Sequence, residues 1–455
     1  MTRDMTTPSQ VSASQPPHDM TQDRTEIRLG ILLPLTGSDA AIGKALFKAA
    51  ALALFDSRDQ RLSLLPFDTK GTAEGAEKAM TQLLEQQPDV IIGPLFSHSI
   101  AAIKPLAQNA GINVIGFSSD HTVAGEGVFL LNFPMEEQIE RVIRYASAQG
   151  YAKYAALIPE TAYGTRALEI FSKNVIHEKR ELIAVEFYPA DSGKLVTPVK
   201  NIAKYNDRRN KYTRETDFLE NLGEEDDLAQ EMLDELKNVE TIGDVDFDAI
   251  LLPEGGAMLT TLAAWVSYYE IDPAKIKILG TGLWDDRMLF LEPQLYGGWF
   301  AAPDHTAANI FLARYREIYH QKSPRLITLS YDAVALAATL VRQERVPDFS
   351  EEALTNENGF SGIEGLFRFS SAGLIERGLA IYEVGPKDFT VIDPAPESFI
   401  DRDLPVPIKT NPPEFDPADY LKEAPLAALP VIDAPTDNRP YPYNPVQKDS
   451  ANKPD

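Results

Sequence analysis

The 455-residue sequence contains no cysteine, and its six histidines show no paired ligand spacing. The first absence excludes disulfides, thiolate zinc sites, iron–sulfur clusters and, in the chain as given, a lipidated N-terminal cysteine. The second leaves no pattern that predicts a histidine metal site. No apolar run approaches the roughly 18 residues of a membrane-spanning helix. We therefore expect no membrane insertion.

Basic residues are scarce relative to acidic ones. The chain has 43 Lys and Arg residues against 68 Asp and Glu residues, which gives a formal net charge of −25. Recognition of nucleic acids begins with clustered positive charge, so we expect no nucleic-acid partner. Hydrophobic residues make up 44% of the chain. This fraction suffices for a packed core, and the length suits two domains of ordinary size.

The two ends of the chain differ from its middle in composition. Residues 1–25 are rich in Thr, Ser, Gln and Pro and contain no apolar segment of the kind found in signal peptides. We expect this segment to be disordered. Two locations remain open, namely the cytoplasm, or the periplasm with an export signal missing from the chain as given. Residues 400–455 are rich in proline, which predicts an extended or disordered C-terminal tail.

Short apolar runs alternate with amphipathic segments through the rest of the chain. The first set of runs covers 27–33, 62–67, 90–92, 114–117 and 128–131. The pattern then starts again and covers 155–158, 183–187, 249–252 and 276–279. Continuous apolar strands separated by helices are typical of parallel sheets covered on both faces. The sequence therefore predicts an α/β protein with two doubly wound, Rossmann-like units.

A charged segment, 200–240, separates two strands of the second unit. Its apolar residues Leu228, Met232 and Leu236 recur every four positions, as on one face of a helix. Gly223 divides them from an earlier helical series. We expect two polar helices here, arranged as a protruding hairpin.

Polar residues follow two predicted strands of the first unit. Ser97 and Ser99 come after the run 90–92 at the start of a predicted helix, and Ser118, Ser119 and Asp120 come after the run 114–117. Ligands of open α/β sheets bind outside the carboxyl ends of the strands. Hydroxyls and helix N–H groups there can bind an anion or a carboxylate. Simple capping of the helix accounts for Ser97 and Ser99 equally well.

Sequence signatures of enzymes are missing. The segment from Gly37 to Lys44 follows a strand and opens a helix, as a phosphate-binding loop does. However, five residues rather than four separate its glycines, and Ala45 stands where such a loop needs a Ser or Thr. The sequence contains no nucleophile elbow, kinase motif or dinucleotide-binding motif. We expect no enzyme activity, no cofactor and no metal.

Several motifs resemble type I periplasmic binding proteins of the leucine-binding kind, over roughly residues 28–393. These motifs are Ile31-Leu32-Leu33-Pro34-Leu35-Thr36-Gly37, Val90-Ile91-Ile92-Gly93-Pro94, Gly111-Ile112-Asn113-Val114-Ile115 and Tyr163-Gly164. A second set looks like the penicillin-binding protein activator branch of that superfamily. It consists of Leu251-Leu252-Pro253-Glu254-Gly255-Gly256, Gly280-Thr281-Gly282-Leu283-Trp284-Asp285-Asp286, Gly297-Gly298-Trp299-Phe300 and Ser330-Tyr331-Asp332-Ala333.

The resemblance implies two lobes that are joined by three crossovers and close by hinge motion around a ligand cleft. The crossovers are expected near Phe133, Asp285 and Val346. The expected division of the chain is 26–133 plus 286–345 for lobe 1 and 134–285 plus 346–399 for lobe 2, with the hairpin 200–240 inserted in lobe 2 and the tail 400–455 outside both.

The same resemblance assigns roles to cleft residues. Ser97 matches the hydroxyl that holds an amino-acid α-carboxylate, and Ser118 and Ser119 match a second carboxylate-binding turn. Tyr163 matches the aromatic residue that lies over the ligand, and Glu254 matches the acid that receives the ammonium group. An amino-acid zwitterion needs such donors from one lobe and a carboxylate from the other.

Asp120 departs from this pattern. Amino-acid receptors usually carry Thr or Ser at its place, and a carboxylate there repels a ligand carboxylate in a cleft of low dielectric constant. The long hairpin is a second departure. Both differences favour binding to a protein over binding to an amino acid. Ser99 and Asp120 complete the set of expected cleft residues.

The resemblance therefore implies a non-catalytic periplasmic protein of the ligand-binding type. Its expected role is that of a penicillin-binding protein activator-like regulator of peptidoglycan synthesis, with a peptidoglycan synthase as the partner. The alternative is a substrate-binding protein of an ABC transporter for branched-chain or other amino acids. Its partners would be the transporter permease and a small polar ligand such as an amino acid.

Overall fold

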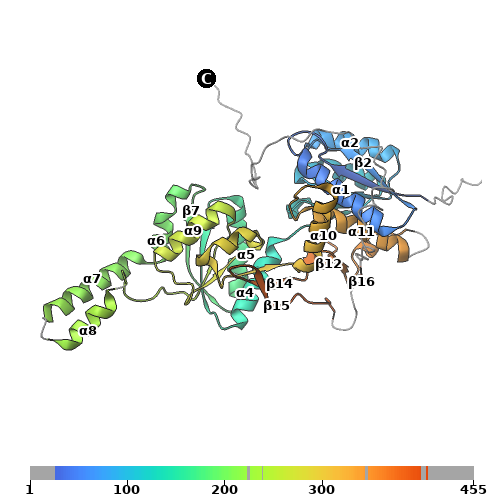
Figure 1. Ribbon diagram of the computed structural model, residues 1–455. Helices are drawn as coiled ribbons and strands as arrows, with labels where there is room; N and C mark the ends of the chain where they lie inside the picture. Colours follow the sequence, from blue (N-terminus) through green and yellow to red (C-terminus); the bar gives the residue numbers. More distant parts are fainter. Residues whose placement is uncertain (1–25, 223–225, 238, 344–346, 401–405, 408–455) are drawn as a thin grey trace, which may run out of the picture.

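The computed structural model describes residues 26–222, 226–237, 239–343, 347–400 and 406–407. The expected disordered segment 1–25 and most of the expected tail 400–455 lie outside the described residues. Two lobes lie side by side, and a pair of helices projects from one of them (Figure 1).

Lobe 1 contains a parallel five-stranded sheet with the order β2-β1-β3-β4-β5. Its strands are β1 (Ile27–Leu33), β2 (Leu62–Asp68), β3 (Val90–Ile92), β4 (Val114–Gly116) and β5 (Val128–Leu130). The helices of this lobe are α1 (Ala40–Ser57), α2 (Ala73–Glu85), α3 (Ser97–Ala110), α10 (His305–Tyr319), α11 (Ile327–Gln343) and α12 (Glu351–Leu354).

The two faces of β1 explain how the sheet of lobe 1 is covered. Leu29 and Ile31 pack into the core formed with α1 and α11, while Leu32 packs into the core formed with α2 and α3. Gly30 leaves room for Leu83 of α2, because a Cβ at this position would lie 2.5 Å from its methyl carbon. Since β1 is buried on both faces, its sequence is a continuous apolar run.

Lobe 2 contains a seven-stranded sheet with the order β15-β14-β10-β9-β8-β6-β7. Its strands are β6 (Lys153–Pro159), β7 (Glu181–Tyr188), β8 (Ala249–Leu251), β9 (Lys277–Leu279), β10 (Trp299–Ala302), β14 (Ala380–Val384) and β15 (Phe389–Asp393). Strands β7-β6-β8-β9-β10 repeat the strand order of lobe 1, and β14 and β15 extend the sheet in antiparallel fashion. The predicted α/β class with two doubly wound units is confirmed.

Helices cover both faces of the second sheet. One face packs against α4 (Met135–Ala148) and α5 (Ala162–His177), and the other packs against α6 (Val196–Ile202) and α9 (Gly256–Tyr268). Helices α7 (Tyr205–Leu222) and α8 (Asp227–Leu236) form the projecting hairpin (Figure 1). The short 3₁₀ helices are η1 (His121–Val123), η2 (Ser192–Lys194), η3 (Gly282–Trp284), η4 (Arg287–Leu291) and η5 (Pro293–Leu295).

A third, small sheet has the order β13-β12-β11-β16 and belongs to lobe 1. Its strands are β11 (Phe360–Gly362), β12 (Gly365–Phe369), β13 (Ile375–Arg377) and β16 (Val406–Pro407). Phe360, Phe367 and Ile375 join the core that α1 and α11 form with the main sheet.

The sheets place two of the three crossovers later than expected. The first lies between β5 and α4, next to Phe133. The second was expected near Asp285, but β10 pairs with β9, so the chain leaves lobe 2 only after Ala302. The third was expected near Val346, but β11, β12 and β13 pack into lobe 1, so the chain returns to lobe 2 only after Arg377.

The expected ranges 286–345 for lobe 1 and 346–399 for lobe 2 therefore do not match the sheets. The physical reason is that an apolar strand such as β10, buried on both faces, fits either sheet equally well. Local sequence does not determine which sheet it joins. Among the helices within the described ranges, none is long and apolar enough to cross a membrane.

Candidate functional site

Ser97 and Asp120 meet at the carboxyl edge of the sheet in lobe 1. Ser97 is the first residue of α3, and Asp120 caps η1 after β4. The Asp120 carboxylate accepts hydrogen bonds from the Thr122 backbone N–H at 3.0 Å and from the Thr122 hydroxyl at 2.6 Å, and Ser97 lies beside it. Burial alone would raise the pKa of Asp120, but these hydrogen bonds outweigh it and lower the pKa. This edge of lobe 1 therefore carries an ionised carboxylate.

The other three serines have different surroundings. Ser99 is fully buried, and its hydroxyl donates to the Thr72 carbonyl oxygen at 3.3 Å. Ser118 is also buried, and its hydroxyl accepts from the Asp120 N–H at 3.0 Å. Ser119 is exposed. Ser99 and Ser118 thus hold the loops of this edge in place, and Ser97 lies beside Asp120.

Tyr163 and Glu254 lie at the corresponding edge of lobe 2. The Tyr163 hydroxyl is 2.9 Å from the Thr281 hydroxyl. Glu254 accepts hydrogen bonds from the Tyr188 hydroxyl at 2.9 Å and from the Gly255 N–H at 3.0 Å. Burial raises the pKa of Tyr188, and the nearby Glu254 and Tyr163 raise it further. Tyr188 therefore stays a neutral donor that holds Glu254.

Strand order explains why these residues gather at the two edges. In lobe 1 the order reverses between β1 and β3, and Ser97 follows β3. In lobe 2 it reverses between β6 and β8, where Tyr163 follows β6 and Glu254 follows β8. Such switch points are the usual ligand positions of doubly wound sheets. The hydrogen bonds given above each join residues of the same lobe.

Two residues of this edge were not predicted from sequence. Tyr188 is the last residue of β7, and Thr281 follows β9, so both lie at the same end of the sheet as Glu254. Thr281 was part of a family motif but received no role. The signal that could have identified both is their place directly at the carboxyl ends of predicted strands.

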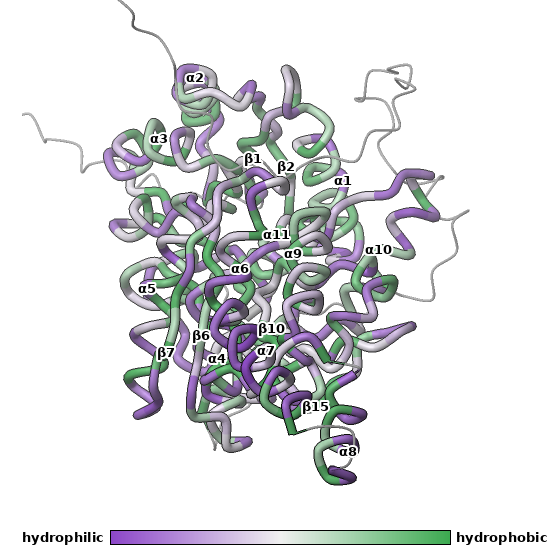
Figure 2. The backbone as a smooth tube through the Cα atoms, turned by 90° about the vertical axis from the view of Figure 1, so that its left-hand side faces the viewer, coloured by the Kyte–Doolittle hydropathy of each residue, from purple (hydrophilic) through white to green (hydrophobic). Residues whose placement is uncertain are grey.

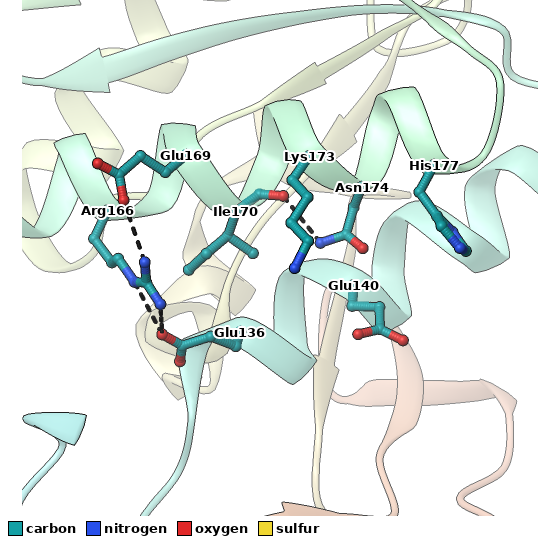
Figure 3. Close-up of a pocket in the computed structure, with 8 residues that line it drawn as sticks. All are labelled: Glu136, Glu140, Arg166, Glu169, Ile170, Lys173, Asn174 and His177. Atoms are coloured by element: carbon teal, nitrogen blue, oxygen red, sulfur yellow. Dashed lines mark hydrogen bonds and ion pairs between the residues drawn. The ribbon is translucent and has the colours of Figure 1, made fainter. Parts of the chain in front are cut away.

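A cavity of about 400 Å³ lies elsewhere on lobe 2, between α4 and α5 (Figure 3). None of the seven predicted cleft residues lines it. Three of its charged residues are paired with one another, because Arg166 bonds to Glu136 at 3.0 Å and to Glu169 at 3.2 Å. The pair of Arg166 with Glu136 ties α5 to α4. No three metal-ligating side chains of the described residues form a group that could hold a metal ion.

A network of ion pairs lies where the three crossovers meet, and we call it the crossover network. Its members are Glu137, Asp285, His305, Arg325, Asp332, Glu364 and Arg377. Arg325 donates to Glu364 at 2.5 Å and also bonds to Asp285 of lobe 2. Arg377 donates through Nε to the Asn132 carbonyl oxygen at 2.7 Å. The Arg377 backbone N–H donates to Glu137 of lobe 2 at 2.7 Å.

The crossover network has more acids than bases. Four carboxyl groups face two guanidinium groups and the imidazole of His305, so the acids outnumber the basic groups in a buried site. Burial raises the pKa of Glu137 to about 8 and that of Asp332 to about 7. Burial would also raise the pKa of Asp285, but contacts with His305 and Arg325 lower it. Burial thus favours the protonated forms of Glu137 and Asp332, which reduces the excess negative charge.

Known proteins share the two-lobed fold. Two doubly wound lobes joined by three crossovers are the architecture of type I periplasmic binding proteins, so the predicted fold and the resemblance to that superfamily are confirmed. Residues 26–206 match the family described as "Periplasmic binding protein". This region covers the main sheet of lobe 1 and the start of lobe 2.

Two curated relatives are similar over part of the chain. An uncharacterized protein of Rickettsia prowazekii, RP748, is 24% identical over 182 residues, which cover 40% of this chain and 48% of that protein. Penicillin-binding protein activator LpoA of Vibrio cholerae is 24% identical over 161 residues, which cover 35% of this chain and 27% of that protein. The similarity thus spans about half of the first relative and about a quarter of the second.

Solved structures of transport proteins share the fold. A structure assigned to a branched-chain amino acid ABC transporter from Rhodospirillum rubrum has a TM-score of 0.63 at 17% identity, covering 81% of this chain and 100% of that one. An ABC transporter substrate-binding protein from Sphaerobacter thermophilus has a TM-score of 0.57 at 17% identity, covering 84% and 99%. At these identities the likeness shows the fold alone.

Proposed function

We propose that the chain is a non-catalytic binding protein of the bacterial envelope that acts through protein contacts, as a penicillin-binding protein activator-like regulator of peptidoglycan synthesis. The observation that carries this proposal is the carboxylate of Asp120, whose pKa is lowered and which lies beside Ser97 at the carboxyl ends of the lobe 1 strands. A carboxylate of the protein thus stands next to the hydroxyl that would hold the α-carboxylate of an amino acid.

Coulomb repulsion gives the size of this effect. A ligand carboxylate about 4 Å from Asp120 would meet a repulsion of about 4 kcal/mol at an effective dielectric constant of 20. This energy corresponds to nearly a thousandfold loss of affinity. Lobe 2 contributes Glu254, a second carboxyl group, which accepts hydrogen bonds from Tyr188 and from the Gly255 N–H. Glu254 suits the ammonium group of an amino acid, whereas Asp120 disfavours its carboxylate.

The comparison with LpoA supports the same proposal, since that protein is described as a penicillin-binding protein activator and shares a 161-residue region with this chain. The projecting hairpin offers a surface for protein contacts that lies away from the carboxyl edges (Figure 1). In this role the expected partner is a peptidoglycan synthase of the penicillin-binding class, and the expected location is the periplasm.

The second candidate is a substrate-binding protein of an ABC transporter. The fold shared with such proteins supports it, and so does the lobe 2 edge, where Glu254 lies with Tyr188 and Tyr163. A carboxylate beside aromatic rings suits a ligand ammonium group. The ligand would then be a small amine or amino acid, and a transporter permease would be the partner.

Thermal unfolding separates the two candidates. A ligand that binds with a Kd of about 1 μM adds about 2.7 kcal/mol of stability at 100 times that concentration. We expect leucine and other neutral amino acids to leave the Tm of the wild-type protein unchanged, and a purified penicillin-binding protein to bind in biolayer interferometry. The Asp120→Ser variant removes the repulsive charge and is the matched control.

Stabilisation of the wild-type protein by a neutral amino acid, lost in Glu254→Ala, would contradict the regulator proposal and support the transport candidate. A response to leucine that appears only in Asp120→Ser would show that Asp120 is what excludes the zwitterion. Absence of binding to every penicillin-binding protein of the native organism would also contradict the regulator proposal.

A further inference from the structure

The hairpin of α7 and α8 carries exposed apolar side chains close together. Phe218 and Leu222 on α7 are 59% and 47% exposed, and Leu228 and Met232 on α8 are 66% and 39% exposed. Ile176 and Ile310 are exposed singly on α5 and α10, and Met288 and Leu291 form a smaller exposed pair on η4. Single exposed apolar residues need no explanation, whereas a group on one projecting element marks a contact surface.

Helix geometry places the four side chains on one face of the hairpin. Leu219 and Ala229 are buried although the hairpin projects from the lobe, so the two helices bury them against each other. Phe218 and Leu222 stand one residue before and three residues after Leu219. Leu228 and Met232 stand one before and three after Ala229.

Two antiparallel helices in contact are related by an approximate twofold axis. Residues that stand the same number of positions from Leu219 and from Ala229 therefore lie on the same side of the helix pair, at neighbouring positions of its surface. The exposed apolar side chains form a single stripe across both helices. Figure 2 shows that α7 is mostly hydrophilic, while α8 alternates between hydrophobic and hydrophilic residues.

The charge around this stripe is mostly negative, although Lys237 at the end of α8 pairs with Asp234. We call residues 215–222 and 226–236 the hairpin tip. They contain eight acidic residues and no Lys or Arg. The acidic residues are Glu215, Asp217, Glu220, Asp226, Asp227, Glu231, Asp234 and Glu235. The surface thus combines an apolar stripe with an acidic rim.

We infer that the hairpin tip is a docking surface for a basic amphipathic helix of a partner protein. A helix with an apolar stripe and flanking Lys or Arg side chains complements both the stripe and the rim. A second copy of this chain would bring the same acidic rim against the first, and an anionic membrane surface would be repelled in the same way. This inference rests on the proposed protein-contact function, and it specifies the chemistry of the partner.

A peptide of defined pattern tests the surface directly. The probe is a fluorescein-labelled 18-residue peptide of Leu and Lys with Leu at helical spacing, and its control is a peptide of the same composition in an order without an apolar stripe. Fluorescence polarisation is measured with the full chain at low and moderate salt. We expect the patterned peptide to bind at least tenfold more tightly than the control, and more weakly as salt rises.

Matched variants of the protein locate the contact. Phe218→Ser with Leu228→Ser removes half of the stripe, and Ile176→Ser with Ile310→Ser removes two equally exposed apolar residues elsewhere. We expect at least a tenfold loss of peptide affinity in the first variant and less than a twofold change in the second. Glu220→Gln with Glu231→Gln keeps the stripe and should weaken the salt dependence. Circular dichroism checks that helix content is retained.

Equal binding of the two peptides, or equal losses in the two serine variants, would overturn the inference. Tight binding to neutral phosphatidylcholine vesicles through the same residues would overturn it in favour of a membrane. The hairpin and the proposed function can fail separately. If a penicillin-binding protein binds the chain and the stripe variant binds equally well, the docking surface is wrong while the function stands. If the peptide binds through the stripe but no penicillin-binding protein does, the function is wrong.

Discussion

The crossover network and the hairpin tip are both rich in carboxyl groups, yet their surroundings differ. In the crossover network, four acids share a buried space with Arg325 and Arg377, and the ionised groups are paired. In the hairpin tip, eight acids face solvent without a single Lys or Arg among them. Acidic residues therefore form buried ion pairs in the crossover network and a negatively charged surface in the hairpin tip.

Substitutions in the two regions should therefore affect different properties of the protein. A buried charge that loses its partner keeps its desolvation penalty, so changes in the crossover network should act on folding. A solvated charge loses little when a neighbour is removed, so changes in the hairpin tip should act on binding and leave folding almost unchanged. Acidic residues thus have two separate physical roles in this protein.

Removal of Arg377 should give the largest effect. Arg377→Ala leaves Glu364 without one of its two guanidinium neighbours, and it also deletes the hydrogen bond to the Asn132 carbonyl oxygen. We expect a loss of about 3–5 kcal/mol in the free energy of unfolding, measured by urea denaturation. The control is Arg144→Ala, which breaks an exposed pair with Glu140 and should cost less than about 1 kcal/mol. Similar losses in both variants would remove the distinction between buried and solvated charge.

The pH dependence of stability should be the next largest effect. The pKa of Glu137 is raised to about 8 in the folded protein, and an unfolded Glu titrates near 4.3. Between these values the unfolded chain releases a proton that the folded chain retains, so stability falls as pH rises. Asp332, with its pKa raised to about 7, acts in the same direction. We expect a loss of roughly 2 kcal/mol or more between pH 5.5 and pH 8.5, measured by urea denaturation.

Glu137→Gln provides the control for this pH dependence. The amide cannot ionise, so the variant should lose a large part of the slope and become more stable than the wild type at pH 8.5. Substitution of Glu220 by Gln in the hairpin tip should leave the slope as it is. A wild-type protein that gains stability from pH 5.5 to pH 8.5 would show that the excess acids are ionised in the fold.

The repeating strands and helices could be predicted from sequence, whereas the parts of the fold that depend on contacts between distant residues could not. The apolar run 27–33 predicts β1, because a strand that is buried on both faces is apolar throughout. The local sequence does not show which sheet β10 joins, because that depends on its pairing with β9 and β14. For this reason the lobes were recognised while two crossovers were misplaced.

The candidate site shows the same limit. Ser97, Tyr163 and Glu254 were predicted because they follow strands or match family motifs. Their partners are remote, with Tyr188 lying 66 residues from Glu254 and Thr281 lying 118 residues from Tyr163. Nothing in the local pattern specifies these pairs. The crossover network was missed for the same reason, because Arg325 and Glu364 are 39 residues apart.

The start of α8 should give an intermediate effect that stays local to the hairpin. Asp226 caps this helix by accepting hydrogen bonds from the Leu228 and Ala229 N–H groups at 3.1 Å. Asp226→Ala should destabilise the helix by about 1 kcal/mol. Hydrogen exchange should show faster exchange in α8 and unchanged protection in β1. Asp227→Ala, one residue further on, removes a similar charge without removing the cap, and equal acceleration in both variants would contradict the capping role.

Neutralisation of exposed acids in the hairpin tip should have the smallest effect on folding. Asp217→Asn with Glu231→Gln removes two negative charges that face solvent among others of the same sign. The free energy of unfolding should change by no more than about 0.5 kcal/mol and in the stabilising direction, because repulsion is relieved. Urea denaturation at low and high salt measures the change, which should vanish at high salt because screening removes the repulsion in the wild type as well. A loss of several kcal/mol would mean that these acids hold the hairpin together, and the contrast with the crossover network would then fail.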